Sequence, residues 1–277
     1  MTATVGVRAL QTRSGGGRYN RAMRILLTND DGIDAPGLAA LYKAVEGLGE
    51  VHVVAPQKVQ SATSHAVTFH RPIRVASHPG PGGEGVPGTS VGARPADCVK
   101  LAITHLVPQP IDLVISGINA GANVGVNVIY SGTVGAAREA AFFGIPAIAV
   151  SQHVSDWDGI RWDASAKHAG EAIRRVLDGP MTAHTVVNIN IPVLDGGAEP
   201  KGMKAAPIST SSMVDKYEIT PAEDGSFYYK TCNAMTFKTR EPGTDVEALY
   251  DGYITVTPLQ HDVTELGQMP AWSEHIG

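Results

Sequence analysis

Two adjacent carboxylates, Asp30 and Asp31, are the residues whose types and spacing point most directly to chemistry. They follow the apolar run 24–28 and precede Gly32, so a buried strand followed by a turn presents both acids at the strand's carboxyl end. Open α/β sheets bind their ligands at that end. Because two neighbouring carboxylates repel each other unless a cation or a shared proton intervenes, one interpretation is a hard-metal site. The alternative is a capping and turn pair before the following helix.

Further oxygen-bearing side chains occur in the loops after two other predicted strands. Ser61 lies in the polar loop after strand 51–55, and Asn119 and Asn123 follow strand 111–115. All offer oxygen and none offers sulfur, which is the ligand chemistry of Mg²⁺ or Mn²⁺ and not of structural zinc. Taken singly, Ser61 could equally be a turn hydroxyl, and Asn119 could occupy a left-handed turn position.

Ser131, Gly132 and Thr133 stand immediately before the Ala-rich helical run 136–143. Backbone N–H groups at a helix start, with two hydroxyls and no side chain at the glycine, can surround a phosphate oxyanion. An ordinary helix N-cap uses the same residue types, so both interpretations apply to this segment.

The surrounding elements alternate between strands and helices. Apolar patterning and turn residues predict strands at 24–28, 51–55, 111–115, 145–150 and 185–191, and helices at 36–48, 95–107, 136–143 and 162–177. Right-handed crossovers between parallel strands bring all strand carboxyl ends to one edge of the sheet. The loops that carry the oxygen ligands are therefore expected to converge.

The alternation weakens after Pro192. Residues 203–257 have the pattern of hairpins and extended segments, with turn residues at 224–225 and 251–252. We therefore divide the chain into a flexible extension, 1–22, and one domain, 23–277. The domain consists of an α/β core, 23–200, and a smaller β-rich appendage, 201–277.

Composition excludes several classes of protein. A chain of 277 residues with 43% hydrophobic content can bury a large core. Its formal net charge is -5 and its Lys and Arg residues are dispersed, so binding of a nucleic-acid polymer is not expected. No segment has the roughly 18 apolar residues of a membrane span, and the first 22 residues lack the apolar core of a signal peptide. Cys98 and Cys232 have no partner at metal-ligand spacing. We expect a cytoplasmic protein with reduced thiols, which does not bind membranes.

Several motifs together resemble the SurE family of survival-protein nucleotidases. They are ILLTNDDG at 25–32, APG at 35–37, VVAP at 53–56, Ser61, PADCV at 95–99, SGINAG at 116–121, YSGTV at 130–134, NINIP at 188–192, GTD at 243–245 and GYITVTP at 252–258. Their order and spacing cover nearly everything after Met23.

This resemblance implies a metal-dependent 5'-nucleotidase that hydrolyses nucleoside monophosphates, with 3'-nucleotidase and short-chain polyphosphatase activity as further expectations. It matches Asp30, Asp31, Ser61 and Asn119 to the ligands of one divalent cation per subunit, Mg²⁺ or Mn²⁺. It also matches Asn123, Ser131, Gly132 and Thr133 to positions near the phosphate. The implied fold is a Rossmann-like, three-layer α/β domain with a mostly parallel sheet. Its C-terminal β-rich elements exchange between subunits of a homodimer or homotetramer.

Two departures from the family pattern stand near the motifs. Family members usually have Gly-Thr-Pro where this chain has Ala93-Arg94-Pro95, and Gly-Pro-Asn where it has Gly121-Ala122-Asn123. Neither removes an expected ligand. Arg94 could contact an anionic substrate, so the reaction carries over from the family more directly than the substrate preference.

The reaction expected from these residues is in-line attack of water on a phosphomonoester. Asp30 is the favoured residue to orient or deprotonate that water, with water activated by the cation or direct attack by an Asp as alternatives. A signalling receiver domain also has an acidic pair after its first strand, but it needs a phospho-accepting Asp where this chain has Ser116 and Asn119. A non-enzymatic nucleotide sensor would share the pocket and would differ only in lacking turnover.

Overall fold

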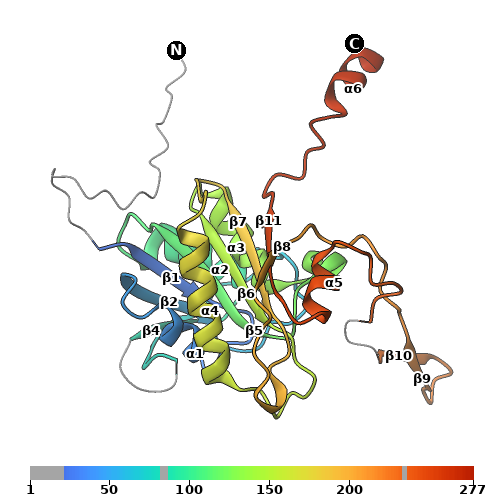
Figure 1. The fold of residues 1–277 in the computed structure, drawn as a ribbon, viewed down its shortest axis with the longest axis horizontal. Helices are drawn as coiled ribbons and strands as arrows, with labels where there is room; N and C mark the ends of the chain where they lie inside the picture. Colours follow the sequence, from blue (N-terminus) through green and yellow to red (C-terminus); the bar gives the residue numbers. More distant parts are fainter. Residues whose placement is uncertain (1–21, 82–86, 233–235) are drawn as a thin grey trace.

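The computed structural model describes residues 22–81, 87–232 and 236–277 (Figure 1). The predicted extension, 1–22, lies outside these residues except for Ala22. In the part of the chain that is described, no helix is both long and apolar enough to cross a membrane.

A central sheet of nine strands dominates the described part of the chain. The strands are β1 (Arg24–Thr28), β2 (Glu50–Pro56), β3 (Val75–His78), β4 (Gly88–Val91), β5 (Leu113–Ala120), β6 (Ala147–Gln152), β7 (Val186–Ile191), β8 (Met203–Ala205) and β11 (Ile254–Leu259). Their spatial order is β3-β4-β2-β1-β5-β6-β7-β11-β8. Strands β4 to β7 of that order run parallel, whereas β3 is antiparallel to β4 and β11 to β7. The predicted mostly parallel sheet is confirmed.

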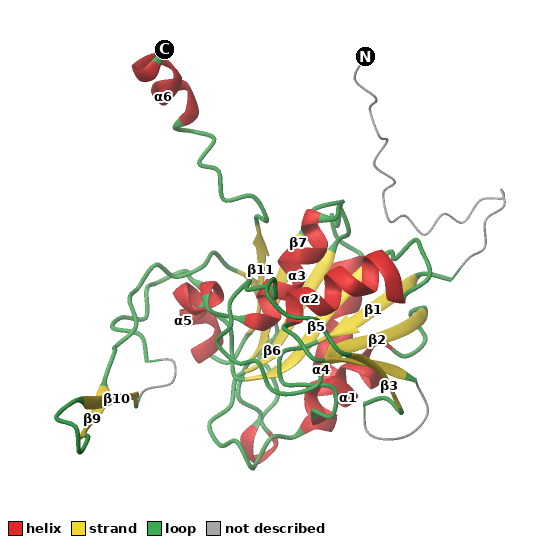
Figure 2. Ribbon diagram, turned by 180° about the vertical axis from the view of Figure 1, so that it is seen from behind, coloured by secondary structure: helices red, strands yellow, loops and turns green. Residues whose placement is uncertain are grey.

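Helices cover both faces of the sheet and complete three layers (Figure 2). Helices α1 (Pro36–Val45) and α4 (Trp162–Leu177) pack on one face, and α2 (Pro95–Leu101) and α3 (Gly132–Phe142) on the other. Proline opens both α1 and α2, where the first turn needs no N–H donor. Helix α2 passes into a π-helical turn, η1 (Ala102–Leu106), and short 3₁₀ turns occur at η2 (Gly125–Ile129) and η3 (Asp195–Gly197).

Burial on both faces explains the continuous apolar runs of the central strands. Ile25 and Leu27 of β1 join the core under α1 and α4, whereas Leu26 joins the core under α2 and α3. A strand covered on both sides needs apolar residues at successive positions instead of at alternate ones. This is why the sequence pattern predicted β1 correctly.

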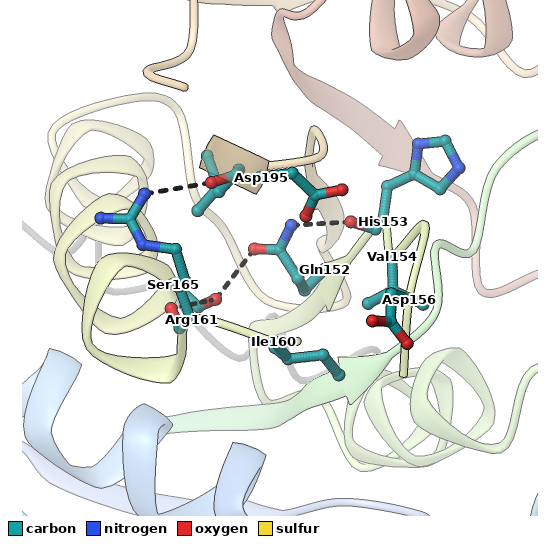
Figure 3. A pocket seen from close by; sticks show the side chains of 9 residues that line it. Gln152, His153, Val154, Asp156, Ile160, Arg161, Ser165 and Asp195 are labelled. Carbon is teal, nitrogen blue, oxygen red and sulfur yellow. Dashed lines mark hydrogen bonds between the residues drawn. The ribbon is translucent and has the colours of Figure 1, made fainter. Parts of the chain in front are cut away.

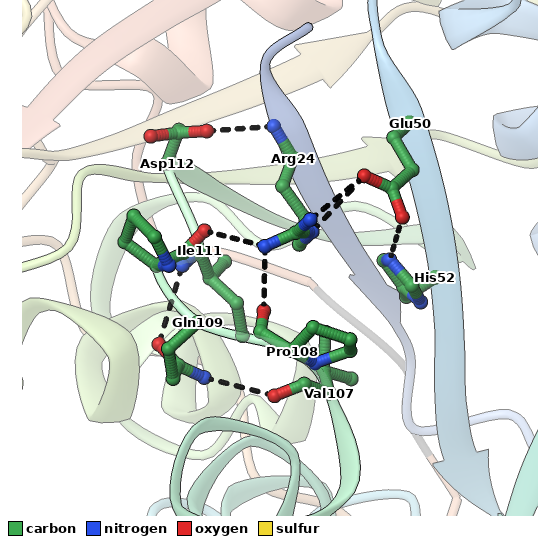
Figure 4. Close-up of polar contacts among 9 residues, drawn as sticks. Arg24, Glu50, His52, Val107, Pro108, Gln109, Ile111 and Asp112 are labelled. Atoms are coloured by element: carbon green, nitrogen blue, oxygen red, sulfur yellow. Dashed lines mark hydrogen bonds and ion pairs between the residues drawn. The ribbon is translucent and has the colours of Figure 1, made fainter. Parts of the chain in front are cut away.

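A polar cluster holds the amino-terminal edge of the sheet together, opposite the strand ends that carry the acid pair (Figure 4). The Arg24 guanidinium donates to Glu50 at 3.0 and 3.1 Å and to the Pro108 carbonyl at 2.9 Å, and the Arg24 backbone N–H donates to Asp112 at 2.7 Å. The hydrogen bond from Arg24 lowers the pKa of Glu50. The cluster ties β1 to β2 and to the segment that enters β5.

Strand β5 continues past the point where the sequence pattern ended it. The apolar run predicted a strand at 111–115, but pairing continues to Ala120, with a shift of register against β6 between Ser116 and Asn119. Gly117 makes the shift feasible because its φ is +140° and a Cβ atom there would lie 2.2 Å from the Val150 carbonyl oxygen. The sequence pattern alone carries no signal for this irregular extension.

The C-terminal part, 201–277, is divided between the sheet and projecting elements. Strands β8 and β11 extend the main sheet, and a helix that the sequence analysis missed, α5 (Asp245–Tyr250), packs beside them. The hairpin of β9 (Tyr217–Pro221) and β10 (Phe227–Thr231) and the helix α6 (Met269–Ile276) both project from the body of the molecule (Figure 1).

The close approach of Gly117 to the Val150 carbonyl can be tested by substitution. We expect Gly117→Ala to lower the free energy of unfolding by about 3 kcal/mol or more, since it combines a positive φ with a backbone collision. Gly47→Ala is the matched control, because Gly47 also has a positive φ, +81°, but a Cβ atom there would meet nothing within 4 Å; its cost should be about 1 kcal/mol. Urea unfolding measures both, and equal losses would contradict the collision.

Candidate active site

The acid pair lies at the carboxyl end of β1, in a turn that hydrogen bonds between Asn29 and Gly32 close. The Asn29 amide donates to the Gly32 carbonyl at 2.8 Å, and the Gly32 N–H donates to the Asn29 side-chain oxygen at 3.2 Å. Asp30 is buried and Asp31 is partly buried. The segment therefore forms a turn, as one of the two interpretations predicted. The side chain that makes the turn contacts is Asn29, so both aspartate side chains can make other contacts.

Asp31 meets the end of β5, the strand that carries Asn119. The Asp31 carboxylate accepts a hydrogen bond from the Ala120 N–H at 3.2 Å. The Asn119 amide nitrogen donates to the Gly121 carbonyl at 2.6 Å, a bond that does not use its side-chain oxygen. The extension of β5 beyond residue 115 thus brings Asn119 beside the acid pair.

The loop that carries Ser61 is held next to the same turn by backbone hydrogen bonds. The Gln60 N–H donates to the Asp30 carbonyl at 2.7 Å, and the Ser64 N–H donates to the Tyr130 carbonyl at 3.0 Å. Ser61 itself is exposed. The structure therefore brings Ser61, Asp30, Asp31 and Asn119 to one edge of the sheet, as the strand topology predicted.

The start of α3 packs directly onto Asp30. The Thr133 hydroxyl donates to the Asp30 carboxylate at 2.5 Å, and a Cβ atom at Gly132 would lie 2.9 Å from the same carboxyl group. Ser131 caps the helix, since its hydroxyl oxygen accepts from the Val134 N–H at 3.1 Å. The capping interpretation holds for the Ser131 side chain, and Gly132 lets the helix approach the acid.

Asn123 is anchored by two asparagines of β7 that sequence reasoning missed. Its N–H donates to the Asn190 side-chain oxygen at 2.7 Å, and its carbonyl accepts from Asn188 at 2.7 Å and from Asn190 at 3.1 Å. Its own amide donates to the Ser151 hydroxyl at 2.8 Å. Alternating asparagines in an otherwise apolar strand were the available signal, because buried polar groups need partners.

Asp245 connects this loop to the C-terminal part of the chain. One carboxylate oxygen accepts from the Gly125 N–H at 2.9 Å, and the other accepts from the Ser209 N–H at 2.9 Å and the Val246 N–H at 2.8 Å. Asp245 is fully buried. The loop that contains Asn123 is thus fastened to α5 as well as to the sheet.

Arg94, the residue that departs from the family pattern, lies at the start of α2. It follows β4, which is separated from β1 by β2 in the sheet, and its backbone N–H donates to the Asp97 carboxylate at 3.2 Å. Asp97 also accepts at 3.1 Å from the Thr68 N–H, in the segment beyond Ser61. Arg94 is therefore at the same edge of the sheet as the acid pair but not beside it.

The electrostatics of the acid pair follow from burial. Desolvation raises the pKa of Asp30 from 3.8 to about 7; the charge of Asp31 adds to this effect and the Thr133 hydrogen bond opposes it. Desolvation also raises the pKa of Asp31, against the hydrogen bond from Ala120. Neither carboxylate has a cationic partner among the described residues, so the pair would gain stabilisation from a cation or would hold a proton.

The donor atoms at this edge suit a hard divalent cation. Among the described residues, no group of three or more His, Cys, Asp and Glu side chains could hold a metal ion. The predicted ligand set consists of the two carboxylates of the acid pair and two neutral oxygens, from the Asn119 amide and the Ser61 hydroxyl. Such a set suits Mg²⁺ or Mn²⁺, which accept neutral oxygen and water ligands, and does not suit zinc.

Comparisons with known proteins agree on one family. The family model "Survival protein SurE" matches residues 25–215. The 5'-nucleotidase SurE of Nitratidesulfovibrio vulgaris (strain DSM 19637 / Miyazaki F) is 44% identical over 249 residues, 88% of each chain. That of Syntrophobacter fumaroxidans is 41% identical over 87% of this chain and 95% of its own. The crystal structure of the SurE protein from Aquifex aeolicus superposes with a TM-score of 0.76 at 33% identity, over 92% of this chain and 100% of that one.

The raised pKa of Asp30 predicts how stability depends on pH without metal. Between about pH 4 and pH 7 the folded acid keeps a proton that the unfolded chain has released, so stability falls as pH rises and levels off above about 7. Asp30→Asn removes this contribution. In chelator, we expect the variant to resist urea better than the wild type at pH 8, with an advantage that shrinks towards pH 4. A constant difference across this range would contradict the assigned pKa.

Proposed function

The chain belongs to the SurE family of 5'-nucleotidases, and we propose that it releases phosphate from nucleoside 5'-monophosphates with the help of one bound divalent cation. The observation that carries the proposal is the contact of the buried Asp30 carboxyl with the start of α3. It places an acid pair and a helix N-terminus at the edge of the sheet where parallel α/β folds bind ligands.

The proposed cation ligands are Asp30, Asp31, Ser61 and Asn119. The first two supply negative charge, which has no cationic partner in the part of the chain that the structure describes, and the last two supply neutral oxygen. When bound, Mg²⁺ or Mn²⁺ would act as a Lewis acid on the phosphoryl group.

The remaining chemistry is assigned to residues of the chain itself. Backbone N–H groups at Gly132 and Thr133, together with the dipole of α3, would stabilise charge on the phosphoryl oxygens. Ser131 and Asn123 would maintain that surface, since one caps the helix and the other fixes the preceding loop. Asp30, oriented by the Thr133 hydroxyl, would align the attacking water and accept its proton.

The proposal extends to 3'-monophosphates and short polyphosphates. The groups assigned above would all act at the phosphoryl end of a substrate, and none of them requires a 5' ester. A terminal phosphoryl group on another carrier would meet the same groups. We expect these activities to be slower than 5'-nucleotide hydrolysis because they lack whatever contacts orient the nucleoside.

We also propose that the protein acts in the cytoplasm. Cys98 and Cys232 are both free thiols, and Cys98 is buried in the core. Free thiols are typical of a reducing compartment.

Phosphate release from a panel of nucleoside monophosphates tests the function. We expect activity that chelator removes and Mg²⁺ or Mn²⁺ restores, and a loss of at least ~100-fold in Asp31→Asn, because the neutral amide no longer supplies charge to the cation. Asp34→Asn is the matched control: Asp34 lies three residues away with an 81% exposed side chain, and its loss should leave turnover unchanged. Nucleotide binding without turnover would instead identify a sensor.

A second copy of the chain is the proposed partner of the projecting hairpin. Paired residues on one of its faces are apolar and exposed, with Ile219 opposite Tyr229 at 55% and 63% exposure. Tyr217 and Phe227 continue this face, which is uncovered in the single chain. A two-stranded hairpin is marginally stable unless another surface covers it. We propose that exchanged C-terminal elements form a homodimer or homotetramer.

The hairpin proposal predicts a change in mass. The double variant Ile219→Lys/Tyr229→Lys should reduce the molar mass measured by light scattering, because it places two charges on the apolar face. Thr220→Lys, on the opposite face of β9, should retain the wild-type mass. If both variants keep the wild-type mass, this face is not the interface.

A further inference from the structure

The segment between β6 and α4, residues 153–161, forms a rim at the same edge of the sheet as the acid pair, since it follows the carboxyl end of β6. One buried side chain, Gln152, holds both ends of this rim (Figure 3). The Gln152 amide donates to the carbonyls of His153 at 2.8 Å and Pro192 at 2.7 Å. Its side-chain oxygen accepts from the Ser165 hydroxyl at 2.9 Å, in the first turn of α4. Gln152 therefore joins the beginning of the segment to the helix that ends it, and the rim is built on rigid supports.

Trp157, in this rim, lies beside Gly121, which is two residues after Asn119. Its Cη2 atom is 3.4 Å from the position of a Cβ on Gly121, and the Asn119 amide nitrogen is 3.7 Å from the same position. The Gly121 N–H donates to the Gln152 carbonyl at 2.9 Å, which ties this contact to the base of the rim. The indole and a proposed cation ligand are thus neighbours across one glycine.

Trp157 is 61% exposed, and one atom of its indole, Cη2, lies beside Gly121. Trp157 is not among the residues that pack against the hydrophobic core. Trp162, at the start of α4, does pack against this core, with its ring against Gly37. A large aromatic ring that lies beside the backbone at one edge and is mostly open to solvent offers a stacking platform.

The charges directly beside Trp157 indicate which end of a nucleotide this platform suits, because Arg161, at the far end of the rim, donates to the Leu194 carbonyl instead. Asp156 and Asp158 flank Trp157, and all three are exposed. Two carboxylates disfavour a phosphate at this end and accept hydrogen bonds from amino groups. The N-terminus of α3 has the opposite preference, because its N–H groups favour anions. A nucleoside monophosphate would therefore bind with its phosphate at α3 and its base towards the rim.

We infer that Trp157 is the residue on which the nucleobase stacks, and that it determines the preference of this site for nucleotides over other phosphomonoesters. The inference rests on the proposed function and deepens it. Stacking on an indole face does not depend on the hydrogen-bond pattern of the base. The preference is therefore for a base as such, with little discrimination among the bases.

Substrates with and without a base separate this role from a structural one. For Trp157→Ala, we expect KM for AMP to rise about tenfold, or ~1.4 kcal/mol, with kcat within twofold, and KM for ribose 5-phosphate to stay unchanged. Trp157→Phe should retain most of the affinity because it keeps an aromatic face. Trp272→Phe removes an exposed indole from α6 and should behave as wild type. An equal change for both substrates, or no change, would overturn the inference.

Fluorescence makes the result independent of turnover. The three tryptophans of the chain are Trp157, Trp162 and Trp272. In Mg²⁺ buffer, AMP should quench the indole emission of the wild type and of Trp272→Phe, and the quenching should disappear in Trp157→Phe. Quenching that persists in Trp157→Phe, or its absence in the wild type, overturns the inference. A wild type that shows Trp157-dependent quenching without phosphate release refutes the proposed hydrolysis and leaves the base platform in place.

Discussion

The organisation of the candidate site depends on a buried carboxyl group, Asp30, that has no cationic partner among the described residues. Burial disfavours its charge, and the hydroxyl of Thr133 compensates for only part of that cost. This contact requires the start of α3 to lie against the turn after β1. Gly132 permits the approach, and the fully buried alanines of α3 let the helix pack closely onto the sheet. This arrangement supports the proposed cation site, because a cation would stabilise the charged form of Asp30.

The loop that contains Asn123 is held in place differently, by hydrogen bonds from buried side chains to its main chain. Asn123 has both its backbone groups bonded to asparagines of β7, and Asp245 secures the backbone at Gly125. These partners lie far apart in the sequence. Because Asp245 also binds the backbone of Ser209, movement of the C-terminal part would be felt at this loop. Asp245 therefore links the C-terminal part, whose exchange we propose, to the loop of the candidate site.

The two ends of the site have opposite polarity. The N–H groups at the start of α3 attract anions, whereas the rim that carries Trp157 is flanked by carboxylates and presents an aromatic face. A substrate with one anionic end and one flat, polar end matches this arrangement. The family's nucleotidase activity and the local chemistry of this chain thus agree on the kind of molecule that the site accepts.

Local patterns in the sequence determined the central strands, the helices that cover them and the edge at which the acid pair lies, because burial on both faces of a parallel sheet produces apolar runs ended by turns. Those rules located Asp30 and Asp31 and the helix start at Ser131. They missed the strands β3 and β4, the helices α5 and α6, and the extension of β5 through Gly117. Strand β4 and the extension of β5 pair with segments that lie far away in the sequence. Only the tertiary structure revealed that Asn190 holds the site loop, because a hydrogen bond between residues far apart in sequence has no local pattern.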